Sequence, residues 1–120
     1  MGLFDKKTKE QIIDEKREYY SQYMVEGEEL LNIYQTIIDF VVVTSKKIIV
    51  IDNSLWKAKT NMIFIPFDKI SAISMEYGAK KYAKREFKLF FGAHTIDITM
   101  FNHENEPMEF FQYVNNQITK

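Results

Sequence analysis

Apolar residues recur along this chain in patterns that predict a helix, a series of short strands and a second helix. Ile12, Tyr19 and Tyr23 share one face at helical spacing, which predicts an N-terminal helix over residues 5–24. From residue 30 to residue 100 the apolar residues instead form short blocks separated by polar or Gly-containing turns, which is typical of an antiparallel sheet. A C-terminal helix follows, and its expected apolar stripe consists of Met108, Phe111, Val114 and Ile118.

Turn residues set the bounds of the expected strands. We expect seven, over residues 30–38, 40–44, 47–52, 61–67, 70–77, 86–91 and 95–100. For the first of them, the alternative is that residues 30–34 extend the N-terminal helix. Pro66 cannot donate to a ladder, so the fourth strand is expected to end there or to lie at a sheet edge. Asn105 is the candidate cap of the C-terminal helix, with Pro107 in its first turn.

Composition narrows the class of protein. A chain of 120 residues with 46% hydrophobic residues fits one compact domain with a single core. The absence of cysteine excludes disulfides, thiolate nucleophiles and Cys-bound metals, and favours a reducing, cytoplasmic setting. No signal peptide or membrane span is expected from the apolar runs. The net charge of −1 does not favour a nucleic-acid partner.

Charge is distributed unevenly along the chain. Residues 30–92 contain ten Lys or Arg against five Asp or Glu, whereas residues 1–29 contain five against eight and residues 93–120 contain one against four. The predicted sheet is therefore basic and both ends are acidic, which could give the sheet a face that attracts anions.

Several segments resemble the bacterial pleckstrin-homology (PH)-like family. The resemblance covers roughly residues 25–118 and rests on four segments in order: Gly27-Glu28-Glu29, the segment from Val43 to Asp52, Ile65-Pro66-Phe67, and the run from Ile70 to Glu76. It implies a mainly β fold: a seven-stranded antiparallel β-sandwich or partly open barrel, capped by a C-terminal α-helix. Residues 25–120 would form this PH-like domain, and residues 1–24 an additional N-terminal helix.

Two features depart from the family pattern. Family members carry an acidic segment before the sixth strand, whereas residues 79–85 here are basic. The loop between the first two strands contains no Lys or Arg, so the sequence does not favour an inositol phosphate ligand.

The loops after the third and fifth strands contain the candidate partner-binding residues. If the strands alternate up and down, both loops emerge at one end and bring cations and aromatic residues together, namely Trp56, Lys57, Lys59, Lys80, Lys81, Tyr82, Lys84 and Arg85. We expect this group to contact an acidic protein partner or an anionic lipid surface. The alternative is a solvated loop that only keeps the protein soluble.

The N-terminal helix is the candidate oligomer interface. Its apolar residues Tyr19, Tyr20, Tyr23 and Met24 could pack on their own sheet or on that of a second copy. The family resemblance also implies self-association. We therefore predict a homo-oligomer.

The sequence gives little support for catalysis. The two histidines, His94 and His103, lack a nearby third ligand, so we expect no metal and no cofactor. The leading hypothesis is a non-catalytic, cytoplasmic binding or scaffolding module that self-associates and presents loops to a protein partner. The alternatives are a module that binds peripherally to the inner face of the membrane, and a purely structural oligomer-forming protein.

Overall fold

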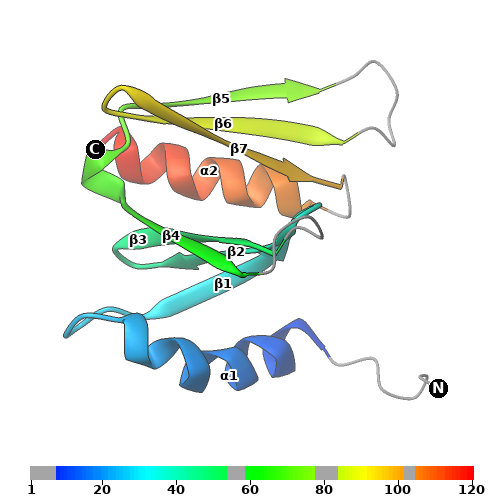
Figure 1. Cartoon of the computed structure of the whole chain (residues 1–120), viewed down its shortest axis with the longest axis vertical. Helices are drawn as coiled ribbons and strands as arrows, with labels where there is room; N and C mark the ends of the chain where they lie inside the picture. The colour runs from blue at the N-terminus through cyan, green and yellow to red at the C-terminus, as the bar shows by residue number, and fades with distance from the viewer. Residues whose placement is uncertain (1–7, 54–58, 78–83, 102–104) are drawn as a thin grey trace.

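The computed structural model describes residues 8–53, 59–77, 84–101 and 105–120 (Figure 1). Its two helices are α1 (Lys9–Tyr20) and α2 (Glu106–Ile118). Between them lie the strands β1 (Leu30–Gln35), β2 (Asp39–Thr44), β3 (Lys47–Asp52), β4 (Asn61–Pro66), β5 (Ala72–Tyr77), β6 (Arg85–Phe91) and β7 (His94–Met100). Short 3-10 turns follow α1 (η2, Ser21–Tyr23) and β4 (η3, Phe67–Lys69).

The strands form two antiparallel sheets, one of four strands in the order β1-β2-β3-β4 and one of three in the order β5-β6-β7. Figure 1 shows α2 between the two sheets and α1 on the outer side of the four-stranded sheet. This is the expected sandwich with a C-terminal helix and an additional N-terminal helix. As expected for a strand that ends in proline, β4 lies at a sheet edge.

The four-stranded sheet is covered on both faces. Val41, Val43 and Val50 face the main core around α2, whereas Val42 and Ile49 belong to a second apolar cluster with Tyr20 of α1. Strands that are buried on both faces need apolar residues at successive positions rather than alternating ones. This explains why β2 and β3 are nearly continuous runs of Val and Ile.

The first strand is shorter than predicted. Residues 30–34 are strand and do not extend the helix, but β1 ends at Gln35 rather than at residue 38. The reason is a turn centred on Thr36, whose hydroxyl accepts hydrogen bonds from the backbone N–H groups of Ile38 (3.3 Å) and Asp39 (3.1 Å). The N–H of Ile37 instead donates to the carbonyl of Thr99 in β7 (3.0 Å), which joins the two sheets at this corner.

Helix α1 is also shorter than the predicted range. It begins after Thr8, whose hydroxyl accepts from the N–H of Gln11 (3.1 Å) while the Gln11 side chain accepts from the N–H of Thr8 (2.8 Å). This reciprocal cap fixes the start of the helix at Lys9. Residues 5–7 lie outside the described residues.

The apolar stripe of α2 was predicted incompletely. Phe110, which is not in the predicted stripe, is fully buried together with Val114, while Met108 and Phe111 are half-buried. Because α2 lies between two sheets, it buries a wider arc of its surface than a helix packed on one sheet. The position of Asn105 as the N-cap is confirmed, but its side chain makes no capping hydrogen bond.

Candidate functional site

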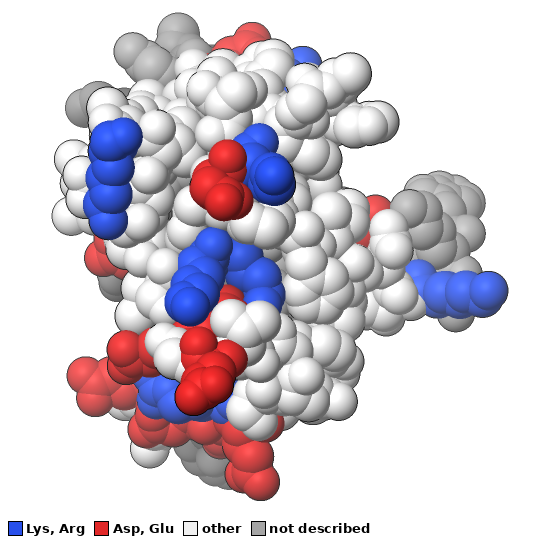
Figure 2. All heavy atoms as spheres, turned by 90° about the vertical axis from the view of Figure 1, so that its left-hand side faces the viewer, with Lys and Arg blue, Asp and Glu red and all other residues white. Residues whose placement is uncertain are grey.

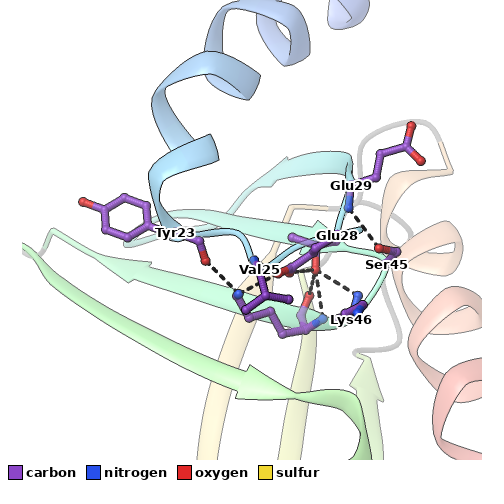
Figure 3. A network of polar contacts seen from close by, with 8 residues as sticks. Tyr23, Val25, Glu28, Glu29, Ser45 and Lys46 are labelled. Atoms are coloured by element: carbon purple, nitrogen blue, oxygen red, sulfur yellow. Dashed lines mark hydrogen bonds and ion pairs between the residues drawn. The ribbon is translucent and has the colours of Figure 1, made fainter.

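A turn after α1 places Glu28 next to the β2–β3 hairpin (Figure 3). The N–H of Glu28 donates to the carbonyl of Val25 (3.0 Å), and Gly27 has a φ of 82°, a backbone conformation that glycine adopts without a steric penalty. The Glu28 carboxylate accepts from the N–H of Val25 (2.9 Å), the ammonium of Lys47 (2.8 Å) and the hydroxyl of Thr44. Its side chain is fully buried, and that of Lys47 is only 12% exposed.

These contacts join the turn after α1 to the hairpin. The Lys47 ammonium also donates to the carbonyl of Tyr23 (2.8 Å), and Ser45 and Glu29 exchange two further hydrogen bonds at 2.9 and 3.0 Å. Burial acts to raise the pKa of the Glu28 carboxyl, but the hydrogen bonds from Lys47, Thr44 and Val25 outweigh it and hold this pKa below its usual value. The network therefore explains why Gly27 and Glu28 precede β1 and why Thr44, Ser45 and Lys47 stand in the hairpin.

Helix α1 packs on its own chain. Arg17 donates to the carbonyl of Leu30 (3.2 Å), and Lys9 forms an ion pair with Glu106 at the start of α2 (2.5 Å). Tyr20 is buried against the sheet, and this burial, with smaller effects from Tyr19, Asp39 and Tyr23, raises the pKa of its phenol to about 12.

The four residues predicted for an oligomer interface therefore have different environments. Tyr20 is buried within its own chain, and Tyr23 and Met24 are half-buried against the same cluster. Tyr19, in contrast, is 53% exposed. Of the four, Tyr19 offers the most surface to a second molecule.

Tyr19 belongs to a row of aromatic side chains that continues onto β4. The ring centroids of Tyr19 and Tyr23 are 6.0 Å apart, and those of Tyr23 and Phe64 are 5.6 Å apart. Phe64 is 41% exposed although it is a large apolar residue. We call Tyr19, Tyr23 and Phe64 the aromatic strip. Phe64 was missed as a site residue, although an aromatic residue alternating with Ile63 and Ile65 in an expected edge strand was a usable signal.

The edge of β4 beside this strip has backbone groups that no other strand in the described structure pairs. Because Phe67 N–H donates to the carbonyl of Lys46 (3.1 Å), and hydrogen-bonded pairs recur at every second residue, Ile65 and Ile63 direct their N–H and C=O groups toward β3. The N–H and C=O groups of Met62 and Phe64 consequently point away from the sheet. Pro66 also points its backbone groups away from β3, so its missing N–H removes no hydrogen bond from the sheet.

A groove of about 540 Å³ lies at the end of β4. It is lined by the turn after α1, the β2–β3 hairpin, η3 and the end of α2, through Val25, Glu28, Ser45, Lys46, Lys47, Pro66, Phe67, Asp68 and Gln117. Figure 2 shows the corresponding side of the molecule, where basic and acidic side chains are interspersed and acidic ones gather toward the α1 end. Of the residues of β4, the groove lining contains Pro66, the last one.

The predicted basic cluster can be followed only in part. Trp56, Lys57, Lys80, Lys81 and Tyr82 lie outside the described residues. Lys59 and Lys84 are exposed, and Arg85 is half-buried beside the sulfur atoms of Met75 and Met108 (3.5 Å each). The Lys84 ammonium lies 5.9 Å from the ring centroid of Phe101, which is itself 54% exposed.

Within the described residues there is no group of three or more His, Asp or Glu side chains placed to hold a metal ion. His94 is exposed and its ring lies 6.0 Å from that of Phe91, while His103 lies outside the described residues. A helix long and apolar enough to cross a membrane is likewise not found in the part of the chain that the structure describes.

Comparison with known proteins places this fold in a family. The crystal structure of a pleckstrin-homology domain from Shewanella amazonensis SB2B has a TM-score of 0.73 and 19% identity, covering 90% of this chain and 99% of that one. A DUF1696 family protein with a pleckstrin-homology domain from Shewanella loihica PV-4 has a TM-score of 0.72 and 20% identity, covering 88% and 92%. No curated protein matches the chain. The family model described as "Bacterial PH domain" matches residues 2–117, and the chain therefore belongs to the bacterial PH domain family.

Proposed function

We propose that this bacterial PH domain is a non-catalytic scaffolding module that associates with a second copy of itself through the edge of β4 and the aromatic strip. The observation that carries the proposal is the outward edge of β4 with exposed Phe64 and Tyr19 beside it. Proteins usually protect such edges with charged residues, bulges or a covering segment. The segment from Asn61 to Pro66 contains no charged residue.

Two β4 strands can pair antiparallel about a twofold axis at Phe64. In that register the N–H of each Phe64 meets the C=O of the other, and the N–H of each Met62 meets the C=O of the second copy's Pro66. The side chains of the two Phe64 residues would then lie opposite each other, flanked by Tyr23 and Tyr19 from both copies. Aromatic pairs across antiparallel strands stabilise the pairing.

The contacts of α1 favour this surface association over an exchange of helices. An exchange would require the turn between α1 and β1 to open, and that turn contains the buried Glu28 carboxylate with its bonds to Val25, Thr44 and Lys47. The same contacts keep Tyr19 and Tyr23 beside Phe64. Helix α1 would therefore stay on its own sheet and contribute its exposed aromatic residue to the interface.

Replacing Phe64 with lysine is expected to shift the protein toward the monomer. The substitution removes the central aromatic residue and places a charge on the strand edge, and we expect the dimer dissociation constant to rise at least about tenfold, or ~1.4 kcal/mol. Sedimentation velocity over a range of protein concentrations measures the change. Ile37→Lys is the matched control, because Ile37 is 49% exposed but lies at the β1–β2 turn and not on β4. A wild-type protein that stays monomeric at every concentration would refute the proposal.

A second candidate function is binding to an anionic membrane surface. Its support is an exposed group at the corner where Ile37 bonds to Thr99, consisting of Ile37, Phe101 and Lys84. Apolar side chains next to a cation are suited to the interface of an acidic bilayer.

For the membrane proposal, we expect sedimentation with phosphatidylglycerol-containing vesicles at low salt and its loss at high salt. The double variant Phe101→Ser, Lys84→Glu should lose this binding, whereas Lys69→Glu, which changes an exposed lysine of η3, should keep it. Binding that does not depend on salt, or that survives the double substitution, argues against the membrane surface.

A further inference from the structure

The groove at the end of β4 combines apolar walls with two kinds of polar group. Val25, Pro66 and Phe67 supply the apolar surface, and Val25 is among the most exposed large hydrophobic residues of the described chain. Ser45 and Lys46 lie on the hairpin side, and Asp68 lies on η3. A volume of about 540 Å³ is in the usual range for a ligand site and exceeds a single side chain.

The polar groups of the groove are not equally available. Lys47 and Glu28 neutralise each other at 2.8 Å and are largely shielded from solvent. The ammonium of Lys46, in contrast, is exposed and makes no hydrogen bond or ion pair to any residue that the structure describes. The Ser45 oxygen accepts from the N–H of Glu29 (3.0 Å), which leaves its own hydrogen available to donate. Lys46 and Ser45 thus offer two adjacent donors to an anion.

Asp68, on η3, supplies the opposite chemistry. Its carboxylate is exposed, and within the described residues it does not pair with Lys46. The groove therefore has hydrogen-bond donors for an anion on the hairpin and a hydrogen-bond acceptor on η3. Apolar side chains line the same groove. A ligand that matches has a carboxylate, an apolar side chain and an N–H donor close together.

We infer that this groove binds the C-terminal end of a polypeptide chain whose last residue is apolar. The terminal carboxylate lies against Ser45 and Lys46, the apolar side chain lies against Val25, Pro66 and Phe67, and a backbone N–H of the ligand faces Asp68. Binding of a terminal carboxylate by a few donors beside an apolar pocket is an established mode of peptide recognition. The inference gives the scaffold a protein partner at a site whose lining does not include Phe64, although Pro66 belongs both to this lining and to the proposed β4 contact.

The test is a titration of ¹⁵N-labelled full-length protein with the peptide N-acetyl-Ala-Ala-Leu, followed by NMR. We expect saturable shifts at the backbone amides of Val25, Ser45, Lys46 and Asp68. The same peptide with a C-terminal amide should bind at least about fivefold more weakly, because it lacks the charge that Lys46 attracts. Equal affinity for the two peptides, or shifts that map elsewhere, would overturn the inference.

Two variants distinguish binding in the groove from a general charge effect and from dimer formation. Lys46→Glu should abolish binding of the free-acid peptide, whereas Lys69→Glu, a charge reversal of equal size outside the groove lining, should leave it within about twofold of wild type. Phe64→Lys should bind the peptide normally, so a failure of dimer formation would not be mistaken for a failure of the groove. Free leucine binding as tightly as the peptide would make this an amino-acid site and would contradict the assignment to a chain terminus.

Discussion

Replacing Glu28 with alanine is expected to lower the free energy of unfolding by about 3–5 kcal/mol, which is the usual cost of leaving one member of a buried ion pair without its partner. The Lys47 ammonium would keep only the carbonyl of Tyr23, and the N–H of Val25 would lose its acceptor. The hydroxyl of Thr44 would keep only the carbonyl of Lys47 (3.1 Å). The substitution acts at the point where α1, β1 and the hairpin meet, so the packing of α1 should weaken with it.

Urea unfolding monitored by circular dichroism measures this loss. Glu29→Ala is the matched control, because Glu29 is exposed and uses its backbone, rather than its carboxylate, to bond Ser45. We expect this control to change stability by no more than about 0.5 kcal/mol. If both substitutions cost the same, the Glu28 network is not what holds the turn in place.

The pH dependence of stability should change in the same variant. Because the pKa of Glu28 is lower in the folded protein, the ionised carboxylate stabilises the fold above its unfolded pKa, and this contribution is lost as pH falls through the folded pKa. The Glu28→Ala protein should therefore show a shallower fall in stability on acidification than the wild type.

Replacing Phe110 with alanine is expected to cost about 3–5 kcal/mol, the range for removing a buried aromatic ring from a core. Phe110 is fully buried, and its ring centroid lies 5.2 Å from that of Phe87 and 5.7 Å from that of Tyr34. These neighbours belong to the two different sheets. The cavity left by the substitution would therefore loosen the contact of α2 with both.

Two further substitutions serve as comparisons for Phe110→Ala. Phe101→Ala removes a mostly exposed ring and should cost no more than about 0.5 kcal/mol in the same urea experiment. Phe111→Ala removes a half-buried ring at the position that the sequence placed in the helix stripe, and it should cost less than Phe110→Ala. The reverse order would mean that α2 packs by the predicted stripe and not by the observed one.

The strands were predictable because their local signals and their tertiary environment agree. Ser45 and Lys46 form the turn between β2 and β3, as expected, and β3 has the predicted bounds. In β7, Ile98 and Met100 are buried and alternate with polar residues. Where a period of two is present and one face is buried, the side-chain direction follows from the sequence alone.

The errors occur where a third element decides which side chain is buried. Phe110 was left out of the helix stripe because the sequence does not tell that α2 is covered from two sides. The role of Glu28 was hidden for a similar reason: its partner Lys47 is nineteen residues away, on the third strand. From a run of charged residues in the sequence, one cannot tell which two form a buried ion pair. Nor can one tell which cation, such as Lys46, stays exposed and able to bind a ligand.

For the candidate sites too, the sequence predicted some features and the structure was needed for others. Family resemblance and strand patterns identified the scaffold, but Phe64 became a candidate only when the structure placed it beside Tyr23 on an edge strand. Of the basic loop residues, the structure describes Lys59, Lys84 and Arg85, and the remaining members of that hypothesis lie outside the described residues.

Amide hydrogen exchange at the β4 edge, measured residue by residue at low and high protein concentration, tests self-association most directly. If two β4 strands pair, the N–H groups of Met62 and Phe64 should exchange more slowly at high concentration, while that of Ile63, which faces β3, should be protected at both. Phe64→Lys should remove the concentration dependence at Met62. Exchange at Met62 and Phe64 that is the same at all concentrations would contradict pairing through β4.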